Sequence, residues 1–245
     1  MNNQYTFLAD KYDLLTDDID YRSWGKYISS LLNDYSCSSV IEAGCGTGNI
    51  TFELIENGFS VIPFDISIDM LSVAKNKAVE RGLDVMFICQ DMSEMEMPES
   101  DAVVCACDGT NYLESGQLKS FMHSSFKALK KGGVLLFDMS SEHKIRDILG
   151  NNVFYVDRDD MFMFWTNQYD PAQNKCVIEL SFFIKTDDGK YVREDERQEQ
   201  YAYPSETILQ YLKDAGFSNV YCYEFLTKNE SDGKNCDRVQ YVAVK

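Results

Sequence analysis

Residues 40–50, with the sequence VIEAGCGTGNI, decide the fold prediction for this chain. A short apolar run ends in the acid Glu42, three glycines follow within five residues, and a helix-like sequence resumes at Asn49. The start of a helix carries free backbone N–H groups and a partial positive charge, and glycines let a ligand approach the main chain closely. The segment therefore predicts a strand, a ligand-binding turn and a helix.

The spacing of the glycines distinguishes two kinds of ligand. A dinucleotide-binding turn has the pattern G-x-G-x-x-G, which would place its third glycine at position 49. Here that position is Asn49, and the glycines at 44, 46 and 48 form the pattern G-x-G-x-G. This spacing argues against a pyrophosphate. A nicotinamide-dependent oxidoreductase is therefore only an alternative, and the chain also lacks a recognisable proton donor for one.

The first two-thirds of the chain alternates between strand-like and helix-like patterns. Strands are expected over residues 39–44, 59–65, 83–91, 100–108 and 134–140, and helices over residues 20–32, 49–57, 67–82 and 115–133. The strands are apolar on both faces, which is typical of a parallel sheet covered by helices on both sides. This pattern predicts an α/β fold with a doubly wound, Rossmann-like sheet.

The pattern changes at residue 152. Strand-like runs follow one another up to residue 203, and the turn sequences DPAQNK and DDGK separate them. We expect this segment to be an antiparallel β insertion that covers one edge of the core. Residues 204–217 return to a helical pattern, and the tail predicts a closing hairpin.

The composition limits the possible partners. Among 245 residues there are 23 Lys and Arg against 40 Asp and Glu, a formal charge of −17, so extended nucleic-acid binding is not expected. The N-terminus has no basic and apolar leader pattern and no apolar run is long, so no membrane association is expected either. Eight cysteines without a CxxC pair, and only two histidines, indicate a cytoplasmic protein with reduced thiols and no metal site.

Polar residues stand at the ends of successive predicted strands. Asp65 ends the second strand, 21 residues after the first glycine, where a carboxylate can accept hydrogen bonds from ribose hydroxyls. Asp91 ends the third strand, and Asp108, Asn111 and Tyr112 follow the fourth. Ligands bind at the carboxyl ends of the strands in such sheets, so these side chains are expected to meet in one crevice.

These segments together resemble the class I S-adenosylmethionine-dependent methyltransferases. VIEAGCGTGN matches the first motif of that family, and FDISIDML, QDM and DAVVCACDGTNYL match the second, third and fourth. The resemblance covers at least residues 5–140. Residues 5–24 are similar to a bacterial small-molecule branch of the family, which has an N-terminal helical lid and an inserted antiparallel sheet.

The resemblance implies a seven-stranded, mostly parallel sheet whose last strand is antiparallel. It divides the chain into an N-terminal helical lid (1–35), a cofactor-binding core (36–151 with 204–245) and an inserted antiparallel substrate cap (152–203). The implied cofactor is S-adenosyl-L-methionine. This molecule has no phosphate, so its loop has no need of the dinucleotide spacing.

The same resemblance implies roles for individual residues at the cofactor. Glu42 and the glycine loop line the methionine end, and Asp65 takes the ribose hydroxyls. Asp91 lies at the adenine amine, and Ile66 and Met92 lie on the two faces of the adenine ring.

An aromatic lid completes the implied cofactor site. Tyr12, Tyr21 and Trp24 close over the methionine part, where a ring face suits a sulfonium cation, and plain helix packing is the alternative for them. The full predicted cofactor-binding set is Tyr12, Tyr21, Trp24, Glu42, Ala43, Gly44, Cys45, Gly46, Thr47, Gly48, Asn49, Asp65, Ile66, Ser67, Met70, Asp91, Met92 and Asp108.

Methyl transfer from a sulfonium is an in-line displacement with an activated leaving group, so the protein mainly aligns the reactants and excludes water. A general base is optional, because a neutral amine needs none before attack. The candidates for a catalytic role are Tyr12, Asn111 and His143. The predicted acceptor-binding residues are Asn111, Tyr112, Arg197, Tyr203 and Arg238. A solvated strand edge is the alternative for Arg197 and Tyr203, and a surface salt bridge is the alternative for Arg238.

The leading functional prediction is a methyltransferase that acts on nitrogen or oxygen of a small molecule, as a monomer or a homodimer. One alternative acts on RNA or protein, although the acidic charge counts against RNA. Another is a module that binds S-adenosylmethionine without transferring its methyl group. The sequence leaves the methyl acceptor open.

Overall fold

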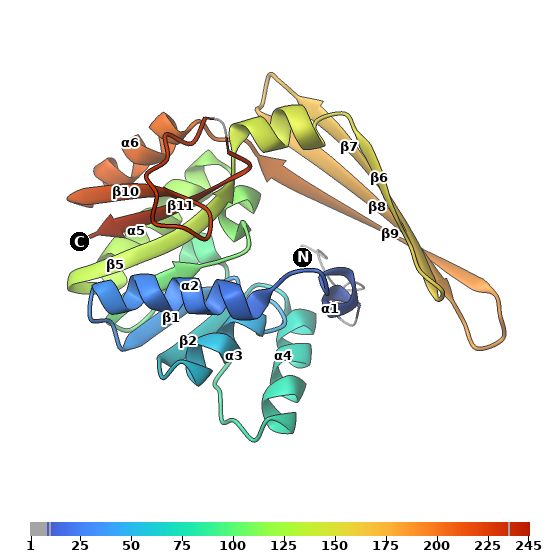
Figure 1. Cartoon of the computed structure of the whole chain (residues 1–245), viewed down its shortest axis with the longest axis horizontal. Helices are drawn as coiled ribbons and strands as arrows, with labels where there is room; N and C mark the ends of the chain where they lie inside the picture. Colours follow the sequence, from blue (N-terminus) through green and yellow to red (C-terminus); the bar gives the residue numbers. More distant parts are fainter. Residues whose placement is uncertain (1–8, 10, 235) are drawn as a thin grey trace.

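The structure of the chain is a computed structural model that describes residues 9, 11–234 and 236–245. It consists of a helix-covered sheet and a second sheet that projects from it as an arm (Figure 1). Part of the predicted lid, residues 1–8 and 10, lies outside the described residues.

The main sheet has seven strands in the order β10-β11-β5-β4-β1-β2-β3. Their bounds are β1 (Ser39–Ala43), β2 (Ser60–Asp65), β3 (Ile88–Cys89), β4 (Ser100–Cys105), β5 (Leu129–Ser140), β10 (Asn219–Glu224) and β11 (Arg238–Val244). Strands β1 to β5 pair in parallel, whereas β11 pairs antiparallel with both β5 and β10. The predicted doubly wound sheet with an antiparallel last strand is confirmed.

Helices cover both faces of this sheet. They are α2 (Tyr21–Asp34), α3 (Asn49–Glu56), α4 (Ile68–Glu80), α5 (Ser115–Ala128) and α6 (Ser205–Ala215). Helices α2 and α3 pack on alternate residues of the central strands, and α5 and α6 pack on the residues between them. Alternate side chains of a strand point to opposite faces, so each central strand serves both cores.

The structure differs from the sequence prediction at several places, among them the fourth strand, which was expected to reach residue 108 and ends at Cys105. The third strand, expected over 83–91, is only Ile88–Cys89, because it lies at the sheet edge and Met86 stands exposed before it. The helix expected up to 133 ends at Ala128, and Leu129 is already extended and buried as the start of β5. A short π-helix, Lys144–Leu149, follows β5 and was not expected.

The insertion forms the second sheet, which confirms the predicted antiparallel subdomain. Its four strands pair in sequence order: β6 (Val153–Asp157), β7 (Met161–Asp170), β8 (Lys175–Lys185) and β9 (Tyr191–Tyr201). Its buried cluster includes Met163, Ile178 and Phe182, and it also takes in Ile145 and Leu149 of the π-helix. The π-helix therefore joins the arm to the core. In Figure 1 it is the unlabelled yellow-green helix between β5 and the arm.

The N-terminal segment contains two parts with different surroundings. Helix α2 packs in the core through Trp24, Ile28 and Leu32. The short helix α1 (Tyr12–Leu15) buries none of its residues fully and lies beside the inserted sheet in Figure 1. No helix among the described residues is long and apolar enough to cross a membrane.

Candidate functional site

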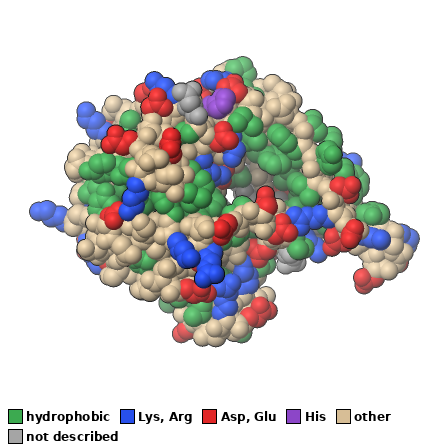
Figure 2. Space-filling view, in the orientation of Figure 1, with side chains coloured by type: hydrophobic (Ala, Val, Ile, Leu, Met, Phe, Trp, Pro, Cys, Tyr) green, Lys and Arg blue, Asp and Glu red, His purple; other side chains and the backbone are tan. Residues whose placement is uncertain are grey.

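A cavity of about 1060 Å³ lies between the carboxyl edge of the main sheet and the inserted sheet. Figure 2 shows the corresponding opening between the core and the arm. Thirteen of the predicted site residues line it: Tyr12, Trp24, Gly44, Gly46, Asp65, Ile66, Met70, Asp91, Met92, Asp108, Tyr112, Arg197 and Arg238. The topology therefore brings the ends of β1, β2, β3 and β4 together, as the strand-end acids predicted.

The glycine loop connects β1 to α3 with three glycines in the left-handed region, Gly44, Gly46 and Gly48. A Cβ on Gly48 would lie 3.0 Å from Phe52 and 3.3 Å from Ala74, so this glycine is required by packing between helices. A Cβ on Gly46 would meet nothing within 4 Å. The first two glycines line the cavity, whereas the third packs against α3 and α4.

Asp65 at the end of β2 holds the loop in place. Its Oδ2 accepts a hydrogen bond from the Gly46 N–H at 2.8 Å, and its Oδ1 accepts one from the Ser67 N–H at 2.8 Å. Burial raises the pKa of Asp65, and these backbone donors oppose that rise. Each carboxylate oxygen keeps a lone pair that can accept another donor from the cavity.

Asp91 and Met92 follow β3 and lie on the side of Gly44, the first glycine of the loop. The Ser93 N–H and Oγ both donate to Oδ1 of Asp91, at 2.7 and 2.8 Å, so Oδ2 is left to face a ligand. The methyl group of Met92 lies against Gly44, at 3.7 Å from where a Cβ would stand. Ile66 lines the cavity although its side chain is 51% exposed, which gives a flat ring an apolar surface.

The N-terminal segment reaches the loop through Asp13. Its Oδ1 accepts hydrogen bonds from Thr47 Oγ1 at 2.7 Å and Asn49 Nδ2 at 2.8 Å, and its Oδ2 pairs with Lys77 Nζ. Burial favours a higher pKa for Asp13, but these three donors outweigh it and lower the pKa. We call these contacts of Asp13 with Thr47, Asn49 and Lys77 the Asp13 clasp. It holds the neighbouring Tyr12 in the cavity lining, where burial raises the pKa of the phenol.

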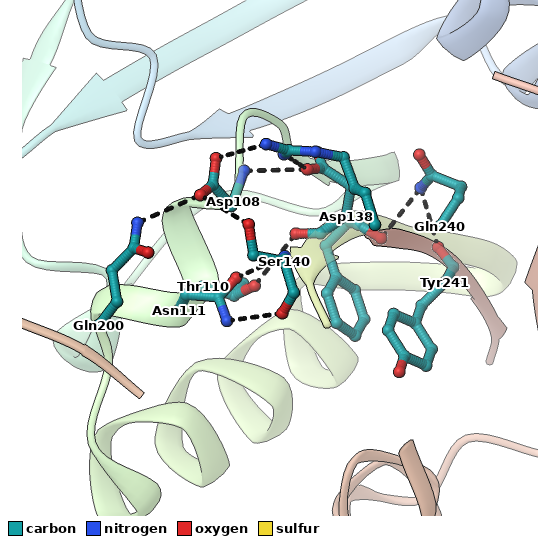
Figure 3. Close-up of polar contacts among 10 residues, drawn as sticks. Asp108, Thr110, Asn111, Asp138, Ser140, Gln200, Gln240 and Tyr241 are labelled. Atoms are coloured by element: carbon teal, nitrogen blue, oxygen red, sulfur yellow. Dashed lines mark hydrogen bonds and ion pairs between the residues drawn. The ribbon is translucent and has the colours of Figure 1, made fainter. Parts of the chain in front are cut away.

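A partly buried ionic network lies beyond β4 (Figure 3), and Asp138 is its fully buried member. Arg238 pairs with Asp108 at 3.0 Å and with Asp138, and the Asp108 N–H donates to Asp138 Oδ2 at 2.9 Å. The Arg238 guanidinium also lies 5.2 Å from the ring centre of Trp24. Arg238 therefore joins the last strand to the ends of β4 and β5, and Asp108 and Asp138 compensate its charge.

The same network reaches the inserted sheet. Asp108 Oδ2 accepts hydrogen bonds from Ser140 Oγ and from Gln200 Nε2 on β9, both at 3.2 Å (Figure 3). Asp108 has a positive φ of 50°, an uncommon conformation for a residue other than glycine. The core and the arm are thus connected by side chains at the wall of the cavity.

Known proteins with a similar sequence identify the family. Residues 40–133 match the family model described as a methyltransferase domain. A relative in Geobacillus sp. (strain WCH70), provisionally named a methyltransferase, is 31% identical over 98% of this chain and 99% of its own. The crystal structure of an S-adenosylmethionine-dependent methyltransferase from Clostridium acetobutylicum is 32% identical, covers 98% of both chains and gives a TM-score of 0.88.

This chain is a class I S-adenosylmethionine-dependent methyltransferase. Its cofactor is S-adenosylmethionine. A sugar N-methyltransferase, KedS8 of Streptoalloteichus, is 18% identical with a TM-score of 0.76 and covers 96% of this chain. That likeness concerns the fold, and it extends over the inserted sheet as well as the core.

The residues of the methyltransferase cavity fit this cofactor. The sulfonium and the amino group of S-adenosylmethionine are cationic, and the lining at the strand ends carries the carboxylates of Asp65 and Asp91, while that of Asp108 is paired with Arg238. The glycine loop is open toward the cavity at Gly46. Ile66 offers an apolar surface beside Asp91, so an adenine ring and its amine have matching partners.

Several predicted residues of the methyltransferase do not line the cavity. Asn111 is buried, and its amide bonds the Ser140 carbonyl at 3.1 Å and the Tyr201 carbonyl at 3.0 Å. His143 is half-buried, and its Nδ1 lies 2.8 Å from Asp147 Oδ2. Tyr203 donates its hydroxyl to the Leu113 carbonyl. The other residues behind the lining are Tyr21, Glu42, Ala43, Cys45, Thr47, Gly48, Asn49 and Ser67.

Glu42 lies directly behind the glycine loop. Its side chain is fully buried and accepts a 2.6 Å hydrogen bond from Thr51 Oγ1. Burial raises the pKa of Glu42 to about 8, so this carboxyl is mostly protonated at neutral pH. Ser67 has a local task as well, because its hydroxyl accepts the Met70 N–H at the start of α4.

Other lining residues were missed by sequence reasoning. From the inserted sheet they include Met163, Trp165, Ile178, Leu180, Gln198 and Gln200. From the end of β5 and the π-helix after it they include Ser140, Lys144 and Leu149. Their positions at the end of the predicted fifth strand and just after it could have indicated Ser140 and Lys144. An acid inside the apolar run LLFDMS could have indicated Asp138. No local signal distinguishes the lining residues of the inserted strands from their neighbours.

Proposed function

We propose that the enzyme transfers the methyl group of S-adenosylmethionine to a nitrogen or oxygen atom of a small molecule bound under the inserted sheet. The observation that carries this proposal is a single cavity with two kinds of wall. One wall is formed by the glycine loop and the strand-end acids, and the other by the inserted strands. A cofactor on the first wall and an acceptor on the second would share one enclosed volume.

In this proposal the cofactor binds to the wall formed by the glycine loop and the strand-end acids. Asp65 would accept the ribose hydroxyls, Asp91 would accept the adenine amine, and Ile66 and Met92 would lie on the faces of the ring. Tyr12 would cover the methionine part, because the Asp13 clasp holds it in the lining.

The acceptor half is proposed to lie against the inserted sheet. Its apolar lining is provided by Leu149, Met163, Trp165, Ile178 and Leu180. Gln198 and Gln200 on β9, with Tyr112 from the core, add groups that can orient a polar acceptor. In this arrangement residues 152–203 act as a substrate cap.

The electrostatics of the rim favour a small molecule over RNA. Strand β9 contributes Asp195, Glu196 and Glu199 to the lining, and these carboxylates oppose a phosphate backbone. The fold neighbours include a sugar N-methyltransferase, which supports a small acceptor at the level of the fold only.

The chemistry asks little of individual side chains. When bound, S-adenosylmethionine supplies an electrophilic methyl group on a sulfonium. The chain's own residues would orient the two reactants for in-line attack and keep water out. The raised pKa of the Tyr12 phenol keeps it neutral, so it can donate a hydrogen bond but does not compete as a nucleophile.

Calorimetric titration with S-adenosylmethionine, S-adenosylhomocysteine and NAD tests the cofactor half. We expect binding of the first two, at least about tenfold weaker in Asp65→Ala and unchanged in the exposed control Asp84→Ala. Transfer of a labelled methyl group to a panel of amines, phenols and RNA then tests the acceptor half. Transfer to RNA alone would contradict the small-molecule proposal, and cofactor binding without transfer to any acceptor would favour a binding module.

A further inference from the structure

Three cationic side chains line the cavity, and two of them already have anionic partners. Arg238 pairs with Asp108 and Asp138, and Arg197 lies 2.7 Å from Glu199. The third is Lys144. Among the described residues no carboxylate forms an ion pair with its ammonium, and no acceptor forms a hydrogen bond with it.

The backbone of Lys144 is firmly held. It is the first residue of the π-helix after β5, and its N–H donates to Ser141 Oγ at 3.0 Å. One residue later, Ile145 is fully buried in the cluster of the inserted sheet. The ammonium therefore belongs to the junction of the two walls, where an acceptor would lie beside the cofactor.

The carboxylates around Lys144 compensate its charge only in part, and none of those described forms an ion pair with it. The charged groups that act on it are Arg238, Asp108, Asp237 and Asp138. Burial lowers the pKa of Lys144 and Arg238 lowers it further, although the three carboxylates oppose this. Asp108 and Asp138 are already paired with Arg238, so they cannot also compensate Lys144 fully.

We propose that Lys144 binds a carboxylate group of the methyl acceptor. A partly desolvated ammonium gains most from a charge-assisted hydrogen bond, and a carboxylate supplies one negative charge. A phosphate dianion suits the place less, because Asp108 and the acids of β9 also line the cavity. With the apolar wall of Met163, Ile178 and Leu180, the acceptor class is an amino or hydroxy acid with an apolar body.

This inference rests on the proposed function, since it assumes that the acceptor occupies the same cavity. It goes further because it assigns a specificity-determining residue that none of the sequence motifs contains. It also predicts which part of the acceptor is fixed, while the nitrogen or oxygen to be methylated lies elsewhere on the molecule.

The role of Lys144 is tested by comparing acids with their neutral amides as ligands of the complex with S-adenosylhomocysteine. We would titrate 4-hydroxybenzoate, 4-aminobenzoate and 3-(4-hydroxyphenyl)propanoate against the corresponding neutral amides, and follow binding by ligand-observed NMR. We expect at least one acid to bind about tenfold more tightly than its amide. The preference should disappear in Lys144→Met, return in part in Lys144→Arg and persist in the exposed control Lys131→Met.

Separate results identify the failure of each proposal. Equal binding of acids and amides, failure of every acid to bind, or an acid preference that survives Lys144→Met would overturn the role of Lys144. Lys144→Met should leave the affinity for S-adenosylhomocysteine within about twofold, because Lys144 lies on the acceptor side. If the proposed cofactor site is wrong, the wild type will not bind S-adenosylhomocysteine. The preference for acids over amides can then be measured in the absence of S-adenosylhomocysteine.

Discussion

The ammonium of Lys77 on α4 lies 2.8 Å from the carboxylate of Asp13, and this contact joins the N-terminal segment to the core beside the glycine loop. The other oxygen of Asp13 accepts from Thr47 and Asn49. A cofactor in the loop would therefore lie under a segment that three donors fasten. We therefore expect the contacts of Asp13 to slow the entry and exit of the cofactor.

Asp13→Asn is expected to speed the release of S-adenosylhomocysteine about three- to tenfold, because the substitution removes the charge that Lys77 compensates. The free energy of unfolding should fall by less than about 1 kcal/mol, since the pair is partly exposed and local. Stopped-flow dissociation and urea unfolding measure the two quantities. Asp34→Asn, which removes an exposed ion pair with Lys228, is the matched control and should leave release unchanged. An equal effect in both variants would contradict a clasp.

Arg238→Met is expected to lower the free energy of unfolding by about 3 kcal/mol, because it leaves Asp108 and Asp138 without their cation. The double variant Arg238→Met/Asp138→Asn should regain part of the loss, since one buried negative charge is then removed. Urea unfolding at neutral pH measures both. Arg193→Met, which removes exposed contacts with Asp195, Ser181 and Phe183, should cost less than about 0.5 kcal/mol. A similar cost for the two single variants would show that the network adds no stability.

Glu42→Gln is expected to change the pH dependence of stability. The native pKa of Glu42 is about 8, above the ordinary value of 4.5, so the native state holds its proton while the unfolded chain loses it. The stabilising contribution is complete below about pH 4.5 and is lost as pH rises to 8, at up to about 1.4 kcal/mol per pH unit. The free energy of unfolding of the wild type should therefore fall between pH 5 and pH 8. In Glu42→Gln this fall should be smaller. Urea unfolding across this range, with the exposed Glu99→Gln as control, would refute the assignment if the two variants behaved alike.

Two glycines of the loop are expected to respond differently to alanine. Gly48→Ala should lower stability by more than about 2 kcal/mol, because its Cβ would meet Phe52 and Ala74 in a left-handed conformation. Gly46→Ala should cost only about 1 kcal/mol, because the space beside it is open. Its Cβ would, however, stand in the cofactor cavity and weaken S-adenosylmethionine binding. Thermal unfolding and calorimetry separate the two effects, and equal stability losses would contradict this packing.

Much of the fold could be predicted because its signals are local. The alternation of apolar strands with helices ending at Gly58, Gly82 and Gly216 indicated the doubly wound sheet before any contact was known. The change of pattern at residue 152 likewise indicated the antiparallel insertion. The misjudged places, such as the short β3 and the start of β5 at Leu129, depend on neighbours that a local pattern does not contain.

Some residues of the candidate site could likewise be predicted from local sequence, and others could not. Asp65, Asp91 and Asp108 follow strands, so their convergence was implied by the topology alone. Asn111 and His143 do not line the cavity, because Asn111 bonds backbone carbonyls and the half-buried His143 lies beside Asp147.

The sequence by itself determined the sheet, the glycine loop and the acids at the strand ends, since each depends on residues within one short segment. Only the tertiary structure decided the clasp of Asp13, the network of Arg238 and the unpaired charge of Lys144. Asp138 and Arg238 are 100 residues apart, and Asp13 and Lys77 are 64 apart. Charge compensation is a property of neighbours in space, so only the folded chain shows that Lys144, among the described cations that line the cavity, has no ion pair.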